Sequence, residues 1–159
     1  MLFRSALNNV GQVAAAQGDW VQADKVYRES LAIRRQLVER LGGTPEALRD
    51  VSVSLDNVGQ VARAQGDWAQ ADKAYRESLE IRRQLVERLG GTPESLADLA
   101  NALQRNAVLP GGPRADLLAE ARSIFSGLVA AHPTVQSYRG ALAWLNLPDN
   151  PLPTPADTP

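Results

Sequence analysis

An internal repeat constrains this chain more than any other feature. The stretch GQVARAQGDWAQADKAYRES, residues 59–78, is nearly identical to GQVAAAQGDWVQADKVYRES, residues 11–30. A shift of 48 residues aligns Leu7–Glu46 with Leu55–Glu94, and only five of those forty positions differ. A fixed period of roughly 20 to 50 residues is typical of solenoids, in which each unit buries its apolar face against a neighbour. The sequence therefore predicts an array of stacked units.

Each unit is predicted to contain two helices. In the second copy, Thr44 can cap the first helix, and Pro45 suits its first position because no backbone donor is needed there. Apolar residues then recur every three or four positions until Gly66, where a left-handed conformation is easily adopted. Asp67 is placed to cap the second helix, which should end at the Gly90–Gly91 pair. Turns this short require the two helices to be antiparallel.

Residues inside the two helices indicate how they pack. Gly59 lies within the first helix, where glycine costs roughly 1 kcal/mol relative to alanine. A close approach of the second helix is the expected reason for this glycine. Trp68 and Tyr75 are predicted to fill the space between helices. The alternative, in which Trp20 and Trp68 form an exposed aromatic platform, is the less favoured interpretation.

The spacing of these residues resembles the tetratricopeptide repeat. The order is Leu55, Val58, Gly59, Ala62, Gly66-Asp67-Trp68, Ala71, Tyr75 and Ser78, and it also occurs 48 residues earlier. The resemblance implies an all-α fold, a right-handed α-solenoid of antiparallel helix pairs with about seven helices. The usual unit has about 34 residues, whereas here LEIRRQLVERLGG extends the second helix. The longer unit is similar to the variant found in kinesin-light-chain-like and related bacterial proteins.

The repeat pattern predicts the organisation of the whole chain. Residues 1–147 are expected to form the solenoid, with units at about 1–43, 44–91 and 92–132 and a capping helix at 134–146. Residues 148–159 contain five prolines and are predicted to form a disordered or extended tail. Met1 falls in the middle of a repeat, so we expect an uncapped N-terminal end at which apolar residues are exposed: Leu2, Phe3, Leu7 and Val10.

Catalytic and metal-dependent functions find no support in the sequence. The chain has no cysteine and one histidine, His132, so a Cys-His or Ser-His-Asp arrangement would have to rest on that residue. No carboxylate–histidine cluster has the spacing of a metal site. We therefore predict a non-enzymatic protein without a cofactor.

Charge and hydropathy argue against nucleic-acid and membrane partners. The formal net charge is −1 with acids and bases interspersed, whereas nucleic-acid binding needs a concentrated basic surface. No apolar run is long enough to cross a bilayer, and no secretory signal begins the chain, so a cytoplasmic location is expected. The arginines of IRRQLVER are interpreted as a solvent-exposed face, with ion pairs Arg35–Glu39 and Arg83–Glu87.

A polar surface on the first helices is the candidate binding site. In solenoids of the resembled type, the first helix of each unit lines the concave side. Its inward face is expected to include Asn8, Ala15, Asp56, Asn101 and Gln104 together with the candidate ligand-binding residues Asn9, Gln12, Asn57, Gln60, Arg63 and Arg105. An amide side chain carries both a donor and an acceptor, so amides repeated at the solenoid period can hold the backbone of an extended peptide. Asparagine at this position of the repeat also resembles the row of asparagines that peptide-binding members of the family use.

The predicted function is a non-catalytic module that binds a peptide or protein segment in the concave groove. Arg105 matches one basic position of the subset that clamps C-terminal carboxylates, but Asn8 and Asn101 replace the clamp lysines. Three alternatives remain open. The asparagines could be inherited by duplication without binding anything, the chain could assemble end to end through its uncapped N-terminal end as a homo-oligomer, or it could be an arm of a larger signalling protein.

Overall fold

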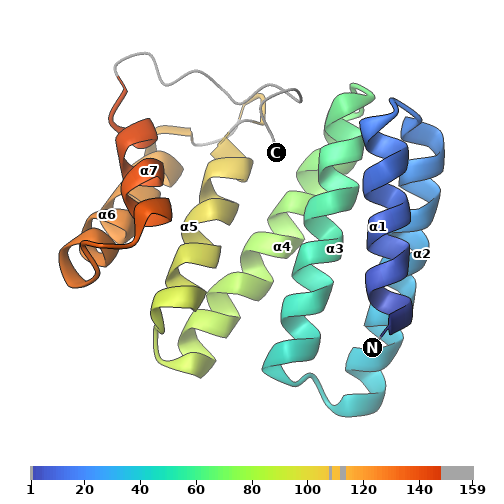
Figure 1. The fold of residues 1–159 in the computed structure, drawn as a ribbon, viewed down its shortest axis with the longest axis horizontal. Coiled ribbons are helices and arrows are strands. Elements are labelled where there is room, and N and C mark those ends of the chain that lie inside the picture. The colour runs from blue at the N-terminus through green and yellow to red at the C-terminus, as the bar shows by residue number, and fades with distance from the viewer. Residues whose placement is uncertain (1, 108, 112–113, 148–159) are drawn as a thin grey trace. The chain divides into compact units, whose positions relative to one another are not determined.

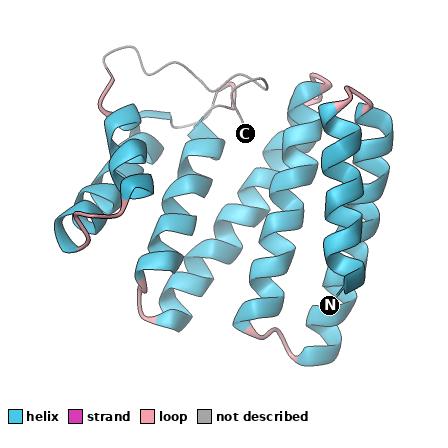
Figure 2. Cartoon of the chain, in the orientation of Figure 1, coloured by secondary structure: helices cyan, strands magenta, loops and turns pink. Residues whose placement is uncertain are grey.

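The computed structural model describes residues 2–107, 109–111 and 114–147, and all regular secondary structure in these residues is helical (Figures 1 and 2). The prediction of an all-α fold built from antiparallel helix pairs is confirmed. The predicted tail at 148–159 lies outside the described residues. The helices are α1 (Leu2–Ala16), α2 (Trp20–Leu41), α3 (Pro45–Ala64), α4 (Trp68–Leu89), α5 (Pro93–Ala107), α6 (Arg114–Ala131) and α7 (Gln136–Leu145).

The chain divides into two compact units, Met1–Ile81 and Arg82–Pro159, and the boundary falls within α4. The first unit holds α1, α2, α3 and α4 as far as Ile81. The second unit holds the remainder of α4 and α5 to α7.

The helix boundaries follow from the capping residues that the sequence predicted. The Asp19 carboxylate accepts the N–H of Gln22 at 3.0 Å, and in the next copy Asp67 accepts the N–H of Gln70 at 3.1 Å. Thr44 caps α3 in the same way, with Pro45 in the first turn. Gly66 has φ +76°, a backbone conformation that only glycine adopts readily, and it separates α3 from α4.

The core of the first unit lies between two stacked hairpins. α2 packs against both α1 and α3, and Figure 1 shows α1 beside α3, with α2 behind α1. Tyr27 and Leu31 of α2 share one buried cluster with residues of α3, namely Val51, Leu55, Val58 and Val61. Each hairpin therefore covers the apolar stripe of the next, as the repeat predicted.

Glycine permits close contact between the helices of each hairpin. A Cβ on Gly59 would lie 2.6 Å from Cε1 of Tyr75, and a Cβ on Gly11 would collide with the ring of Tyr27. Both tyrosines are buried. The prediction that the glycine allows the second helix to approach closely is confirmed, and the tyrosine ring of the second helix occupies the space that a Cβ would fill.

Burial of the tryptophan differs between the two copies. Trp20 packs against the buried cluster of the first unit, whereas Trp68 keeps 45% of its surface exposed. The prediction of a buried Trp68 is therefore wrong. Trp20 begins α2, which packs against α3 of the next hairpin, whereas Trp68 begins α4, the last helix of its unit.

The prediction that the arginines of IRRQLVER form a solvent-exposed face is also wrong for one of the three arginines in each copy. Arg34 and its repeat equivalent Arg82 are buried. Arg34 donates to the backbone carbonyl of Asp50 at 3.0 Å and to the hydroxyl of Ser54, so it ties α2 to the first turns of α3. In the second unit, Arg82 donates to the carbonyl of Asp98 at 2.8 Å.

The next arginine in each copy forms its ion pair with a glutamate of another helix, and not with the glutamate four residues further along its own helix. Arg35 forms its ion pair with Glu77 of α4 in place of Glu39. Arg83 reaches Glu120 of α6 at 2.8 Å in place of Glu87. Both pairs are partly exposed, so each stabilises the fold by at most about 1 kcal/mol.

In the second unit, α6 packs against both α5 and α7. Phe125 and Leu128 of α6 are buried together with Leu145 of α7. The guanidinium of Arg122 donates to the carbonyl of Leu145 at 2.6 Å and so places a positive charge at the C-terminal end of α7, where the helix dipole favours it. A helix thus lies where the capping helix at 134–146 was predicted.

Candidate functional site

Polar side chains of α1 and α3 form the candidate site in the first unit. These two helices lie side by side on one face of the unit (Figure 1). Asn9 and Gln12 are exposed on α1, and Asn57 and Gln60 occupy the repeat-equivalent positions on α3, where they are half-buried. Within the described part of the chain, the side chains of these four residues make no hydrogen bond. Four amides thus present unused donors and acceptors on neighbouring helices.

Two residues that the sequence assigned to this face have a structural role instead. The hydroxyl of Ser78 lies 2.7 Å from Oδ1 of Asp56, and both residues are buried. In the first copy, the hydroxyl of Ser30 donates to Oδ1 of Asn8 at 3.4 Å. The expectation that Asp56 faces a groove is therefore wrong, because Asp56 is buried against the second helix of its own hairpin. Asn8 makes the equivalent contact and is half-buried.

The two candidate arginines differ in location. Arg63 is half-buried near the end of α3 in the first unit, whereas Arg105 is exposed on α5 in the second unit. Both residues already interact with other groups of the chain. Nearby on α5, Asn101 and Gln104 are half-buried. The first unit thus holds five of the six candidates: Asn9, Gln12, Asn57, Gln60 and Arg63.

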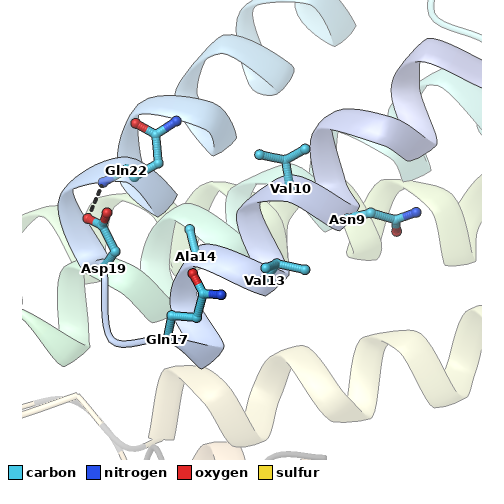
Figure 3. Close-up of a pocket in the computed structure, with 7 residues that line it drawn as sticks. All are labelled: Asn9, Val10, Val13, Ala14, Gln17, Asp19 and Gln22. Carbon is cyan, nitrogen blue, oxygen red and sulfur yellow. Dashed lines mark hydrogen bonds between the residues drawn. The ribbon is translucent and has the colours of Figure 1, made fainter.

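A surface depression at the start of the chain is a second candidate, which the sequence indicated only in part. It lies where α1 meets the beginning of α2 (Figure 3). Val10 was predicted to be exposed and is 49% exposed, and Val13, which was not predicted, is 57% exposed. The side chains of Leu2 and Phe3 lie outside the described residues. The depression is lined by Asn9, Val10, Val13, Ala14, Gln17, Asp19 and Gln22.

The described residues offer neither a metal-binding cluster nor a membrane-spanning helix. No group of three or more histidine, aspartate or glutamate side chains is placed to hold a metal ion in the described ranges. None of the helices described has the length and apolar character needed to span a bilayer.

Stacked helix pairs with repeat-equivalent capping residues, glycines and buried tyrosines define a helical-repeat protein. The model of the tetratricopeptide repeat family matches residues 2–84. The chain belongs to the tetratricopeptide repeat family, as the spacing of the residues shared by its two repeats predicted. These repeats generally mediate protein–protein interaction and are typically non-catalytic. No curated protein matches the chain.

Proposed function

We propose that this chain is a non-catalytic interaction module that binds an extended segment of another protein across α1 and α3. The observation that supports this proposal is the set of amides without intramolecular hydrogen bonds at repeat-equivalent positions, Asn9 with Asn57 and Gln12 with Gln60. The binding surface has no cofactor role. The lack of cysteine supports a cytoplasmic setting for the interaction, because a reducing compartment needs no disulfides.

The chemistry of the amide suits a peptide backbone. A backbone in extended conformation offers one N–H donor and one C=O acceptor per residue, and one asparagine can satisfy both. Asn57 is half-buried, so a ligand that bonds it replaces fewer water contacts than it would at the exposed Asn9. We therefore expect Asn57 to contribute more binding free energy than Asn9.

The proposal is tested with peptides selected from a random phage-displayed library against the intact chain. Two hydrogen bonds with a net value of about 0.5–1.5 kcal/mol each correspond to an increase in Kd of about 5- to 150-fold when Asn57→Ala removes them. Gln36→Ala is the matched control, because Gln36 is an exposed amide on α2, outside the proposed surface. The Arg105→Ala variant, measured with the same peptides, reports whether the ligand also contacts α5.

Titration calorimetry gives the affinities, and circular dichroism checks that helicity is unchanged. Peptides that bind Asn57→Ala and the double variant Asn9→Ala/Asn57→Ala with the affinity of the parent chain would contradict the proposed surface. An equal loss with Gln36→Ala would do the same, because it would show that the effect is not specific to α1 and α3.

A further inference from the structure

The two helices that carry the candidate site lack exposed charge over most of their length. From Ala6 to Ala16 of α1 the sequence contains no charged residue. From Val51 to Ala62 of α3 it contains one, Asp56, which is buried and bonded to Ser78. About three turns of each helix therefore present no charge to a ligand.

The helix α2 of the same unit has the opposite composition. It is described throughout, and it contains eight charged residues among 22, of which only Arg34 is buried. Helices that face water normally carry charged residues on the solvent side. Depletion of charge on an exposed surface is instead typical of the central part of protein–protein interfaces. The contrast within one unit indicates that α1 and α3 face a partner that is itself uncharged at this place.

An exposed aliphatic side chain lies on the same side of α3 as the amides. Val53 is 37% exposed, and it precedes Asn57 by four residues and Gln60 by seven, so the three side chains follow one face of the helix. The amides can bond the backbone of a ligand, but every residue of a ligand has a backbone, so they do not select between side chains. Val53 offers apolar surface beside them, and an aliphatic side chain of the ligand would remove that surface from water.

We propose that the bound segment is uncharged where it crosses α1 and α3 and that it places an aliphatic side chain against Val53. The inference rests on the proposed function, because it assigns the chemistry of the segment that the amides hold. A charged side chain of the ligand would lose water at this surface and would find no opposite charge on these described turns. An uncharged segment gives up only the water on its backbone, and the amides replace those hydrogen bonds.

Charge enters this face of α3 at its two ends. Arg49 lies four residues before Val53, and Arg63 lies three residues after Gln60. Both arginines already interact with other groups of the chain. A charge-free centre with a charged edge is the usual anatomy of an interface. Charged residues of the ligand are therefore expected only outside the part that contacts Val53 and the amides.

Two phage-displayed libraries of random peptides of equal length test the proposal, one with all residue types and one without Asp, Glu, Lys and Arg. Both should yield binders of the intact chain that lose affinity in Asn57→Ala. In binders from the first library, the residues that alanine scanning finds essential should be uncharged and should include an aliphatic one. Because no ion pair contributes, their Kd should change by less than about twofold between about 0.05 and 0.5 M NaCl.

A substitution of Val53 tests the aliphatic contact. Val53→Thr keeps the shape of the side chain but replaces a methyl group by a hydroxyl, so it should raise the Kd of the selected peptides about three- to tenfold. Val21→Ala is the matched control, because Val21 is 77% exposed on α2 and the second copy has Ala69 at this position. It should leave the Kd unchanged. Circular dichroism checks that each variant keeps its helicity.

The outcomes separate this inference from the proposed function. Binders that depend on Asn57 but need charged residues, or whose Kd rises about tenfold at the higher salt concentration, would overturn the inference and leave the amide surface standing. Equal affinity of the peptides for Val53→Thr and for the parent chain would overturn the aliphatic contact in the same way. Binders that are insensitive to Asn57→Ala would overturn both the inference and the proposed function.

Discussion

Substituting Gly59 by alanine should destabilise the first unit, although alanine is the better helix former. The added Cβ would lie 2.6 Å from Cε1, 2.7 Å from Cδ1 and 3.0 Å from Cζ of Tyr75. Carbon atoms that are not bonded to each other do not approach this closely, so the ring or the helix must move. Tyr75 is 3% exposed and is followed along the helix by buried Ser78, so the ring has little room to move.

Two opposing terms set the size of the effect. Replacing glycine by alanine inside a helix stabilises by about 1 kcal/mol. Overpacking a core by a methyl group destabilises by about 1–3 kcal/mol. Contact with three atoms of a buried ring places Gly59 in the upper part of that range, so we expect a net loss of about 1–2 kcal/mol.

The measurement is urea denaturation followed by far-ultraviolet circular dichroism, with Gly127→Ala as the matched control. Gly127 is also inside a helix, but a Cβ there would meet no atom within 4 Å. Gly127→Ala should therefore stabilise the chain by about 0.5–1 kcal/mol. Adding Tyr75→Leu to Gly59→Ala should recover part of the loss, which a double-mutant cycle measures as coupling. If Gly59→Ala were as stable as the parent chain, the argument from ring contact would be refuted.

Two other predictions concern buried polar groups of α2. Arg34→Ala should lower the free energy of unfolding by about 2–4 kcal/mol, because the carbonyl of Asp50 and the hydroxyl of Ser54 lose their donor. Arg35→Ala breaks only a half-exposed ion pair and should lower the free energy of unfolding by less than about 1 kcal/mol. Chemical denaturation measures both changes. Burial raises the pKa of Tyr27 above 10.0, so the folded chain retains this proton after the unfolded chain has lost it. Stability should therefore fall as the pH rises above about 10, and this decrease should be smaller in Tyr27→Phe when unfolding is measured as a function of pH.

Local features of the fold could be read from the sequence, because each depends on residues close together in the chain. The caps at Thr44 and Asp67 and the end of α3 at Gly66 are of this kind. Gly59 could also be interpreted, since an internal glycine that weakens a helix requires a compensating contact.

The predictions that proved wrong concern contacts between helices. The spacing of apolar residues predicts one inward stripe on each helix, but a helix in a stacked hairpin contacts both the other helix of its hairpin and the next hairpin. The wider buried arc takes in Asp56, which meets Ser78 across the hairpin, and Arg34, which meets the start of α3. Neither partner can be identified from the spacing of apolar residues, because polar groups buried this way are satisfied by atoms far away in the sequence.

The near-identity of the two copies separates what a hairpin determines from what its neighbours determine. Tyr27 with Gly11 and Tyr75 with Gly59 make the same contact, so that contact belongs to the hairpin itself. Val13 and Val61 have the same sequence surroundings but opposite exposure, so their difference comes from what lies outside the hairpin.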